Sequence, residues 1–190
     1  MEQCTPRTRK KSHNSTRDTA ENARRGVFVS TQATLYPALW DVRSTFAGLR
    51  SSASTYVSAP TRFAPTLALR VGGDKLWGTY PFYEAAFVGG ASTVRGWREQ
   101  RFVGDASVYG NAELRFFLTK FFFLLPGDLG AFGLADGGRV FQNGERSDAW
   151  HSAFGGGLWA AFLGRTNTLS VSYARGKEGG GFYFRSGLLY

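Results

Sequence analysis

The chain has 190 residues, with 25 Gly, 16% aromatic residues, only 19% charged residues and a formal net charge of +9. One Cys excludes an internal disulfide framework and a cysteine-based zinc cluster, and only two His argue against a histidine-based metal site, so we expect neither a metal nor a cofactor. A sequence rich in Gly and aromatics and poor in charge is typical of many short strands joined by tight turns.

The first 25 residues are strongly basic. They hold seven Lys and Arg against three acidic residues, a net charge of +4, and contain few apolar side chains. Such a segment buries too little apolar surface to offset the entropy of ordering. We therefore expect residues 1–25 to form a disordered basic tail and 26–190 to form the folded region. The basic residues are not interleaved with aromatics on a sheet face, so we expect no nucleic-acid site.

From residue 26 onward, apolar and polar residues alternate with the period of two that is typical of β-strands. Two Gly-rich segments, 129–141 and 153–163, are also expected to be strands, although their facing is ambiguous. Turn signals such as Gly72-Gly73-Asp74 separate the segments. The total is about eight strands. In chain order, the apolar members are Val27, Val29, Ala33 and Leu35; Ala47, Leu49, Ala53 and Val57; Leu67, Leu69 and Val71; Val108, Ala112, Leu114, Phe116 and Leu118; Leu169, Val171 and Tyr173; and Phe182, Phe184, Leu188 and Tyr190.

Two architectures fit this pattern: a soluble sandwich or barrel, and an outer-membrane barrel. The longest uncharged runs, 26–40 and 149–164, are shorter than the ~20 residues of a spanning helix, whereas a spanning strand needs only about 9–11. The polar faces carry Ser, Thr, Asn and Gly rather than many Lys and Glu, which favours a wet lumen and lipid outside. Aromatics near the strand ends fit the girdles at membrane interfaces, namely Tyr36, Trp40, Trp77, Tyr80 and Tyr190.

One long stretch, 78–118, carries a specific combination of motifs. It resembles the bacterial surface antigen family of outer-membrane barrels, which are BamA/TamA-like assembly and translocation barrels. A later Asp136-Gly137-Gly138 and a final aromatic residue fit the same family. The matching pieces within the stretch are Gly89-Gly90, Val94-Arg95-Gly96-Trp97, Gly104-Asp105 and Asn111-Ala112-Glu113-Leu114-Arg115.

The resemblance implies a role for each piece. It implies that a long loop, 72–105, folds back into the lumen and that Arg95 of the Val94–Trp97 motif pairs with an acidic residue on the barrel wall. Asp136 is the first candidate for that residue and Glu113 the second. A guanidinium can pair with a carboxylate at two points. The last strand is expected to act as the outer-membrane insertion signal through Phe182, Phe184, Leu188 and Tyr190.

Relatives carry sixteen strands, so the chain is expected to supply about half of an antiparallel transmembrane barrel. An eight-stranded barrel has room only for its own side chains, not for a folded loop. The missing strands are expected from the N-terminal half of a longer protein or from a second copy. The implied function is non-enzymatic insertion or translocation of client proteins at the bacterial outer membrane, among its lipids. The alternative is a homodimeric half-barrel acting as a passive pore or a structural protein.

A catalytic interpretation depends on a single base, His151, with Ser152 beside it and Asp148 three residues earlier. Adjacent residues on a strand point to opposite faces, so His151 and Ser152 are badly placed to share a proton. We therefore expect no enzymatic activity.

Overall fold

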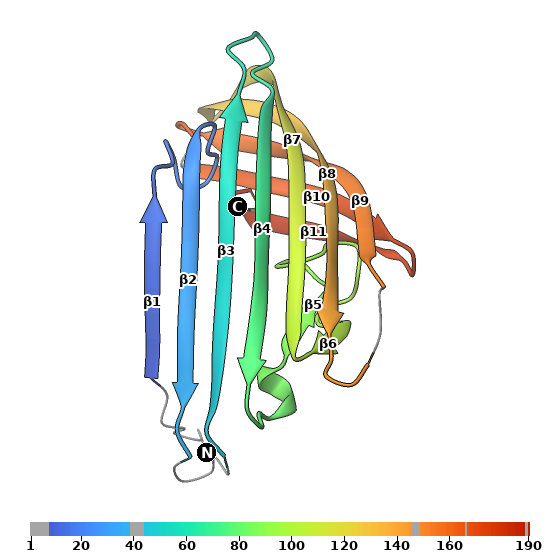
Figure 1. Ribbon diagram of the computed structural model, residues 1–190. Helices are drawn as coiled ribbons and strands as arrows, with labels where there is room; N and C mark the ends of the chain where they lie inside the picture. The colour runs from blue at the N-terminus through green and yellow to red at the C-terminus, as the bar shows by residue number, and fades with distance from the viewer. Residues whose placement is uncertain (1–7, 39–43, 146–148, 166, 189) are drawn as a thin grey trace.

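The computed structural model describes residues 8–38, 44–145, 149–165, 167–188 and 190. Nine strands form one antiparallel sheet in the order β1-β2-β3-β4-β7-β8-β9-β10-β11 (Figure 1). This confirms the all-β antiparallel architecture expected from the alternation. The strands are β1 (Thr8–Ser15), β2 (Gly26–Tyr36), β3 (Phe46–Ser58), β4 (Thr66–Trp77), β7 (Ala106–Phe123), β8 (Leu125–Phe141), β9 (His151–Phe162), β10 (Asn167–Gly176) and β11 (Gly180–Ser186).

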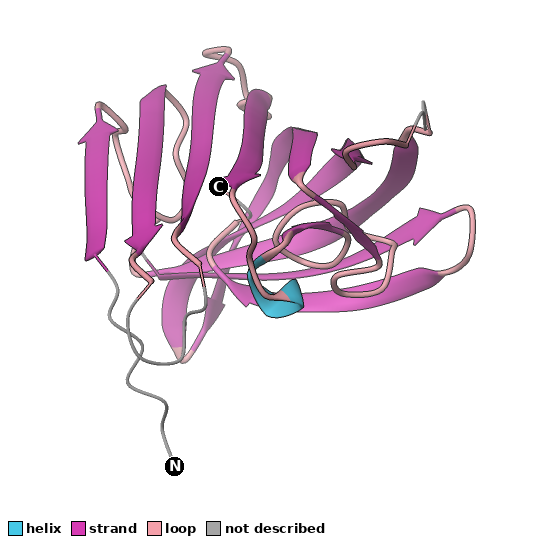
Figure 2. Cartoon of the chain, turned by 60° about the horizontal axis from the view of Figure 1, so that its bottom comes forward, coloured by secondary structure: helices cyan, strands magenta, loops and turns pink. Residues whose placement is uncertain are grey.

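The connection from β4 to β7 has structure of its own. It contains a short 3₁₀ helix, Phe82–Glu84, and a small antiparallel pair formed by β5 (Ala86–Val88) and β6 (Phe102–Gly104). Figure 2 shows the large sheet curving around this helix and its neighbouring loops. No helix among the described residues is long and apolar enough to cross a membrane.

The two faces of the sheet have opposite chemistry. On β7, Asn111 and Glu113 are buried on the inner face, at 4% and 1% exposure, whereas Leu114 on the outer face is 43% exposed. The outer face continues in Val71 and Phe184, which are 55% and 79% exposed. This is the reverse of a soluble barrel and is the arrangement expected where lipid surrounds a polar interior. The Gly-rich strands fit as well, because even-numbered residues of β8 and odd-numbered residues of β9 face inward.

The sheet is open. Among the described residues, β1 and β11 are its two edges and do not pair with each other. An open edge presents unpaired backbone N–H and C=O groups, which a bilayer cannot satisfy. The sheet therefore has the form of part of a barrel rather than a closed one.

The structure differs from the expected disordered tail. Residues 8–15 form β1, which pairs with β2 along its whole length, from Thr8 opposite Leu35 to Ser15 opposite Phe28. Every side chain of β1 is exposed, so this strand is held by backbone hydrogen bonds rather than by apolar burial. The composition of residues 1–25 contains no sign of such pairing because it depends on the free edge of β2. Residues 1–7 lie outside the described part of the chain.

The turn expected at Gly72-Gly73-Asp74 is wrong, because β4 continues through these residues to Trp77. Gly72 lies opposite Tyr109 of β7, and a Cβ added at Gly72 would lie 2.5 Å from the Tyr109 hydroxyl. The glycine therefore makes room for an inward-facing tyrosine rather than reversing the chain. The connection that enters the interior is 78–105, not 72–105.

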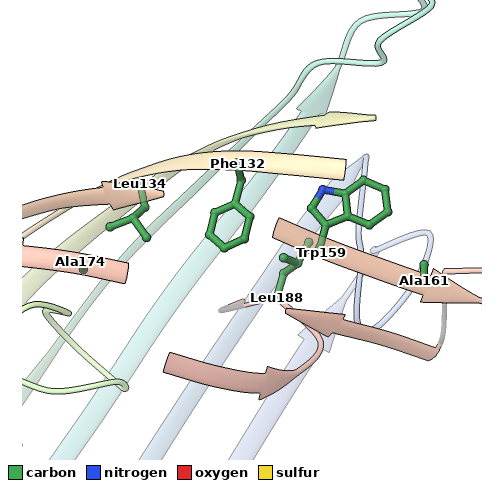
Figure 3. Packing of buried hydrophobic residues seen from close by; sticks show 6 residues of the cluster. All are labelled: Phe132, Leu134, Trp159, Ala161, Ala174 and Leu188. Carbon is green, nitrogen blue, oxygen red and sulfur yellow. The ribbon is translucent and has the colours of Figure 1, made fainter. Parts of the chain in front are cut away.

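The last segment does not keep one face. Phe182 and Phe184 point outward and are 72% and 79% exposed, but Leu188 and Tyr190 are buried, at 6% and 9%. Strand β11 ends at Ser186, and Gly187 adopts a φ of +81°, which interrupts the alternation. Figure 3 shows Leu188 lying in the inner cluster beside Trp159. The prediction that these four residues share one face of the strand is therefore wrong.

The aromatics expected at the membrane interfaces divide in the same way. Trp77 lies on the outer face and is 50% exposed, whereas Tyr36 and Tyr190 are buried on the inner face. Tyr80 lies in the β4–β7 connection, where its hydroxyl donates to Asp105. Trp40 lies outside the described residues.

Candidate functional site

The β4–β7 connection brings Arg95 against the inner wall of the sheet. Its side chain is 3% exposed, and those of Asp136 on β8 and Glu113 on β7 are fully buried. Arg95 Nε donates to Asp136 Oδ2 at 2.7 Å and Nη2 donates to Oδ1 at 2.8 Å. The third nitrogen, Nη1, donates to Glu113 Oε1 at 2.6 Å. The structure thus brings Arg95 together with both acidic residues suggested by the sequence.

Glu113 extends the ion pair to a second arginine. Arg115 donates to Glu113 Oε2 from Nε at 3.0 Å and from Nη2 at 2.7 Å. Arg115 Nη2 also donates to the backbone oxygen of Tyr190 at 3.3 Å. Two guanidiniums therefore face two carboxylates in a buried cluster. Such a cluster tolerates burial only while every member keeps its partner.

The residues around Arg95 fix the backbone of the connection. The backbone N–H of Arg95 donates to Asp136 Oδ2 at 3.0 Å, and that of Gly96 donates to the Tyr183 hydroxyl at 2.7 Å. Gly96 has a φ of +84°, which L side chains rarely adopt. Val94 is fully buried in a cluster with Val88, on β5.

Trp97 anchors the far side of the motif. Its ring is 7% exposed, and its Nε1 donates to the Ser152 carbonyl at 3.1 Å. It meets the ring of Phe102 edge-on at 5.0 Å between centroids. The four consecutive residues Val94–Trp97 therefore all contact the wall or the β5–β6 pair, and they hold the connection against four strands of the sheet.

The sequence profile of one protein family matches this chain. It is described as haemolysin secretion/activation protein ShlB/FhaC/HecB, and it matches residues 16–164. The chain belongs to this family. No curated protein matches the chain significantly. The family is related to, but distinct from, the BamA/TamA-like surface antigens, so the resemblance drawn from the motifs is confirmed at the level of the Omp85 superfamily of barrels and not at the level of the individual family.

ShlB/FhaC/HecB proteins are integral to the bacterial outer membrane and act as non-enzymatic transporters. The surroundings of His151 agree with that assignment. Its ring stacks on Phe102, with 3.4 Å between centroids, and meets Trp97 edge-on, so it serves the packing of the connection. Asp148 lies outside the described residues.

The described part of the chain contains no cluster of side chains that could bind a metal ion. No group of three or more His, Cys, Asp or Glu side chains lies close enough there to hold an ion. Four charged groups of the interior, Arg95, Glu113, Arg115 and Asp136, are instead joined in ion pairs.

Several wall residues that contact the connection were missed in the sequence. Arg70 on β4 and Arg185 on β11 donate to its backbone carbonyls, and Tyr183 accepts from Gly96. The only signal in the sequence is an isolated Arg on the inward face of an otherwise apolar or small-residue strand. That signal gives no partner, because the partner depends on the path of a 28-residue connection.

Proposed function

We propose that this chain forms part of an outer-membrane pore that passes a haemolysin-like exoprotein across the membrane, with the β4–β7 connection closing the lumen. Membership of the ShlB/FhaC/HecB family supports transport of a secreted protein over insertion of outer-membrane proteins. The single observation that carries the closing role is the buried Arg95 contact with Asp136 and Glu113. One guanidinium there holds a whole connection across the inner face.

The loop lengths support an orientation for this pore. The connections at one end of the sheet are at most ten residues long, namely 16–25, 59–65, 124 and 163–166. The connections at the opposite end include the 28 residues 78–105, beside 37–45, 142–150 and 177–179. Outer-membrane barrels have short periplasmic turns and longer extracellular loops. In this orientation the Arg95-bearing connection enters the lumen from the outside, and the turn between β1 and β2 lies at the periplasmic mouth.

Completion of the barrel is part of the proposal. A nine-stranded sheet that already holds a folded connection against its inner face needs more strands to close around it. The free edges of β1 and β11 are where these strands would pair, and they come either from another part of a longer protein or from a second copy of the chain. Outer-membrane lipids cover the apolar outer face.

The transport role predicts a specific secretion phenotype. Cells that express the protein with an epitope-tagged haemolysin of the kind this family exports should release the haemolysin into the medium, and cells without it should retain it. Porin levels in the outer membrane are measured in parallel. Unchanged secretion without the protein would contradict transport, and a fall in porins without a secretion defect would favour insertion of outer-membrane proteins instead.

A further inference from the structure

Three consecutive backbone carbonyls of the β4–β7 connection are each held by a different strand of the wall. The Ala91 carbonyl accepts from Arg185 Nη1 at 2.8 Å, the Ser92 carbonyl from Arg70 Nη1 at 3.0 Å, and the Thr93 carbonyl from Asn111 Nδ2 at 2.6 Å. The donors lie on β11, β4 and β7. None of these contacts uses a side chain of the connection, so they do not depend on its sequence.

One of the three donors, Arg70, is held by the wall as well as by the connection. Arg70 and Asn111 are directly paired across β4 and β7. Arg70 is also fixed by Tyr109, whose hydroxyl accepts from Nη2 at 2.9 Å and whose ring lies 4.9 Å from the guanidinium carbon. Two guanidiniums and one amide therefore face the interior, and Arg70 is the one that Tyr109 holds in place. Hydrogen bonds from charged donors are stronger than those between neutral groups.

Asn111 has a hydrogen-bond acceptor that the connection does not use. Its side chain is 4% exposed, and its Oδ1 is buried with no hydrogen-bond partner, although Nδ2 donates to Thr93. A buried acceptor left unpaired costs free energy. A carboxamide that offers one donor and one acceptor side by side is complementary to the C=O and N–H of an extended polypeptide. The connection supplies only the C=O.

We propose that Arg70, Asn111 and Arg185 form a binding site for the backbone of an extended polypeptide, and that the connection occupies this site as a stand-in for the transported chain. Once Arg95 leaves Asp136 and Glu113, the same three donors become available to the carbonyls of a client segment. Because every residue has a carbonyl, the site accepts any unfolded sequence. The proposal rests on the transport function proposed above, but its test does not use secretion.

The test measures peptide binding to the full chain in detergent micelles by fluorescence anisotropy. The probe is an uncharged 20-residue peptide of Gly, Ser and Asn, which is unstructured in water and carries a neutral BODIPY dye. Arg95→Ala releases the connection and should raise the affinity for the probe over that of the unchanged chain. In that background, Asn111→Leu should lower the affinity about two- to tenfold, the value of one neutral hydrogen bond, and Arg185→Met should lower it by about tenfold or more, because its donor is charged. Arg185→Lys should restore part of the loss.

Arg50→Met is the matched control. Arg50 also faces inward, but it donates to Asp74 at 2.9 Å and its side chain is 63% exposed. In the Arg95→Ala background it should change the affinity less than twofold. Asn111→Leu separates hydrogen bonding from charge, because it removes no charge. If Arg95→Ala prevents folding, judged by heat-modifiable migration on gels, Asp136→Asn provides a milder release.

Three results would overturn the proposal: equal affinity with and without the donors, equal affinity of the unchanged and released chains, or no probe binding when proteolysis shows that the connection is released. Haemolysin secretion is scored separately. If secretion fails while the donors still bind the probe, the transport function is wrong and the site stands. If secretion succeeds and the donors make no difference, the site is wrong.

Discussion

Arg95 and Asp136 are 41 residues apart in the sequence and form a two-point ion pair inside the sheet, with N–O distances of 2.7 and 2.8 Å. The pair joins the β4–β7 connection to β8, and the same guanidinium reaches Glu113 on β7. One side chain thus connects an irregular segment to two neighbouring strands. A buried ion pair of this kind fixes position more than it adds stability, because both ions lose their hydration.

Glu113 accepts from two guanidiniums, so its removal should be costly. Glu113→Gln keeps the size of the side chain but removes one negative charge from the buried cluster and with it the carboxylate that Arg95 and Arg115 share. Removing one partner of a buried ion pair costs about 3–5 kcal/mol. We expect a loss of that size in the free energy of unfolding, measured by urea titration of the chain in micelles with tryptophan fluorescence.

The exposed Glu145 is the control for this measurement, and Glu145→Gln should change the free energy of unfolding by less than about 0.5 kcal/mol. Equal effects of Glu113→Gln and Glu145→Gln would contradict a paired role for Glu113.

Alanine substitutions at two glycines distinguish the cost of backbone strain from the cost of close packing. Gly96 and Gly144 both have a φ of +84°. A Cβ added at Gly96 would lie 2.8 Å from the Gly176 nitrogen, whereas a Cβ at Gly144 would meet no atom within 4 Å. Gly144→Ala should therefore cost about 1–2 kcal/mol from the left-handed backbone alone. Gly96→Ala should cost about 1–3 kcal/mol more, because the wall must move.

Limited trypsin digestion gives a second measure for the Gly96→Ala chain, because Arg98 and Arg101 directly follow the motif. Faster cleavage there than in the Gly144→Ala chain is expected. Identical cleavage rates and stabilities for the two variants would show that Gly96 does not lie against the wall.

The contact between Tyr80 and Asp105 sets a pH window for the connection. Burial, and the hydrogen bond to Asp105, raise the pKa of Tyr80 from 10.0 to about 12. The same hydrogen bond, together with the Asn143 backbone N–H, lowers the pKa of Asp105 below 3.8. The stabilisation that goes with the raised tyrosine pKa is fully present below pH 10 and is lost as the pH rises through 12. The stabilisation that goes with the lowered carboxyl pKa is present above pH 3.8 and is lost as the pH falls further.

Tyr80→Phe tests this window. The stability difference between the unchanged chain and Tyr80→Phe should be constant from about pH 5 to pH 9 and should shrink above pH 10. A difference that stays constant to pH 12, in urea titrations at each pH, would mean that the hydroxyl is not held by Asp105.

The sequence predicted the faces of the sheet well because alternation reports burial directly. Leu114 and Glu113 lie on opposite faces whatever the rest of the chain does. Contacts that depend on a neighbouring strand could not be predicted from the sequence. β1 has no apolar face and exists because β2 offers an edge, and Gly72 resembles a turn until Tyr109 is placed opposite it. Arg70 and Arg185 carry no mark of the carbonyls that they bind.

The predicted facing of the C-terminal segment was wrong for a related reason. Phe182 and Phe184 follow the alternation, but a left-handed Gly187 turns Leu188 and Tyr190 inward. A glycine at that point is compatible with a continued strand or with a turn. The choice depends on the inner partners, which include the Ala68 carbonyl that accepts from the Tyr190 hydroxyl at 3.0 Å.

The central claim, that Arg95 and Asp136 act as one buried unit, is tested most directly by a double-mutant cycle. The free energy of unfolding is measured for the unchanged chain, Arg95→Ala, Asp136→Ala and the double variant. We predict that the double variant loses at least about 2 kcal/mol less than the sum of the single losses, because either substitution already breaks the pair. Additivity within about 0.5 kcal/mol would contradict the claim.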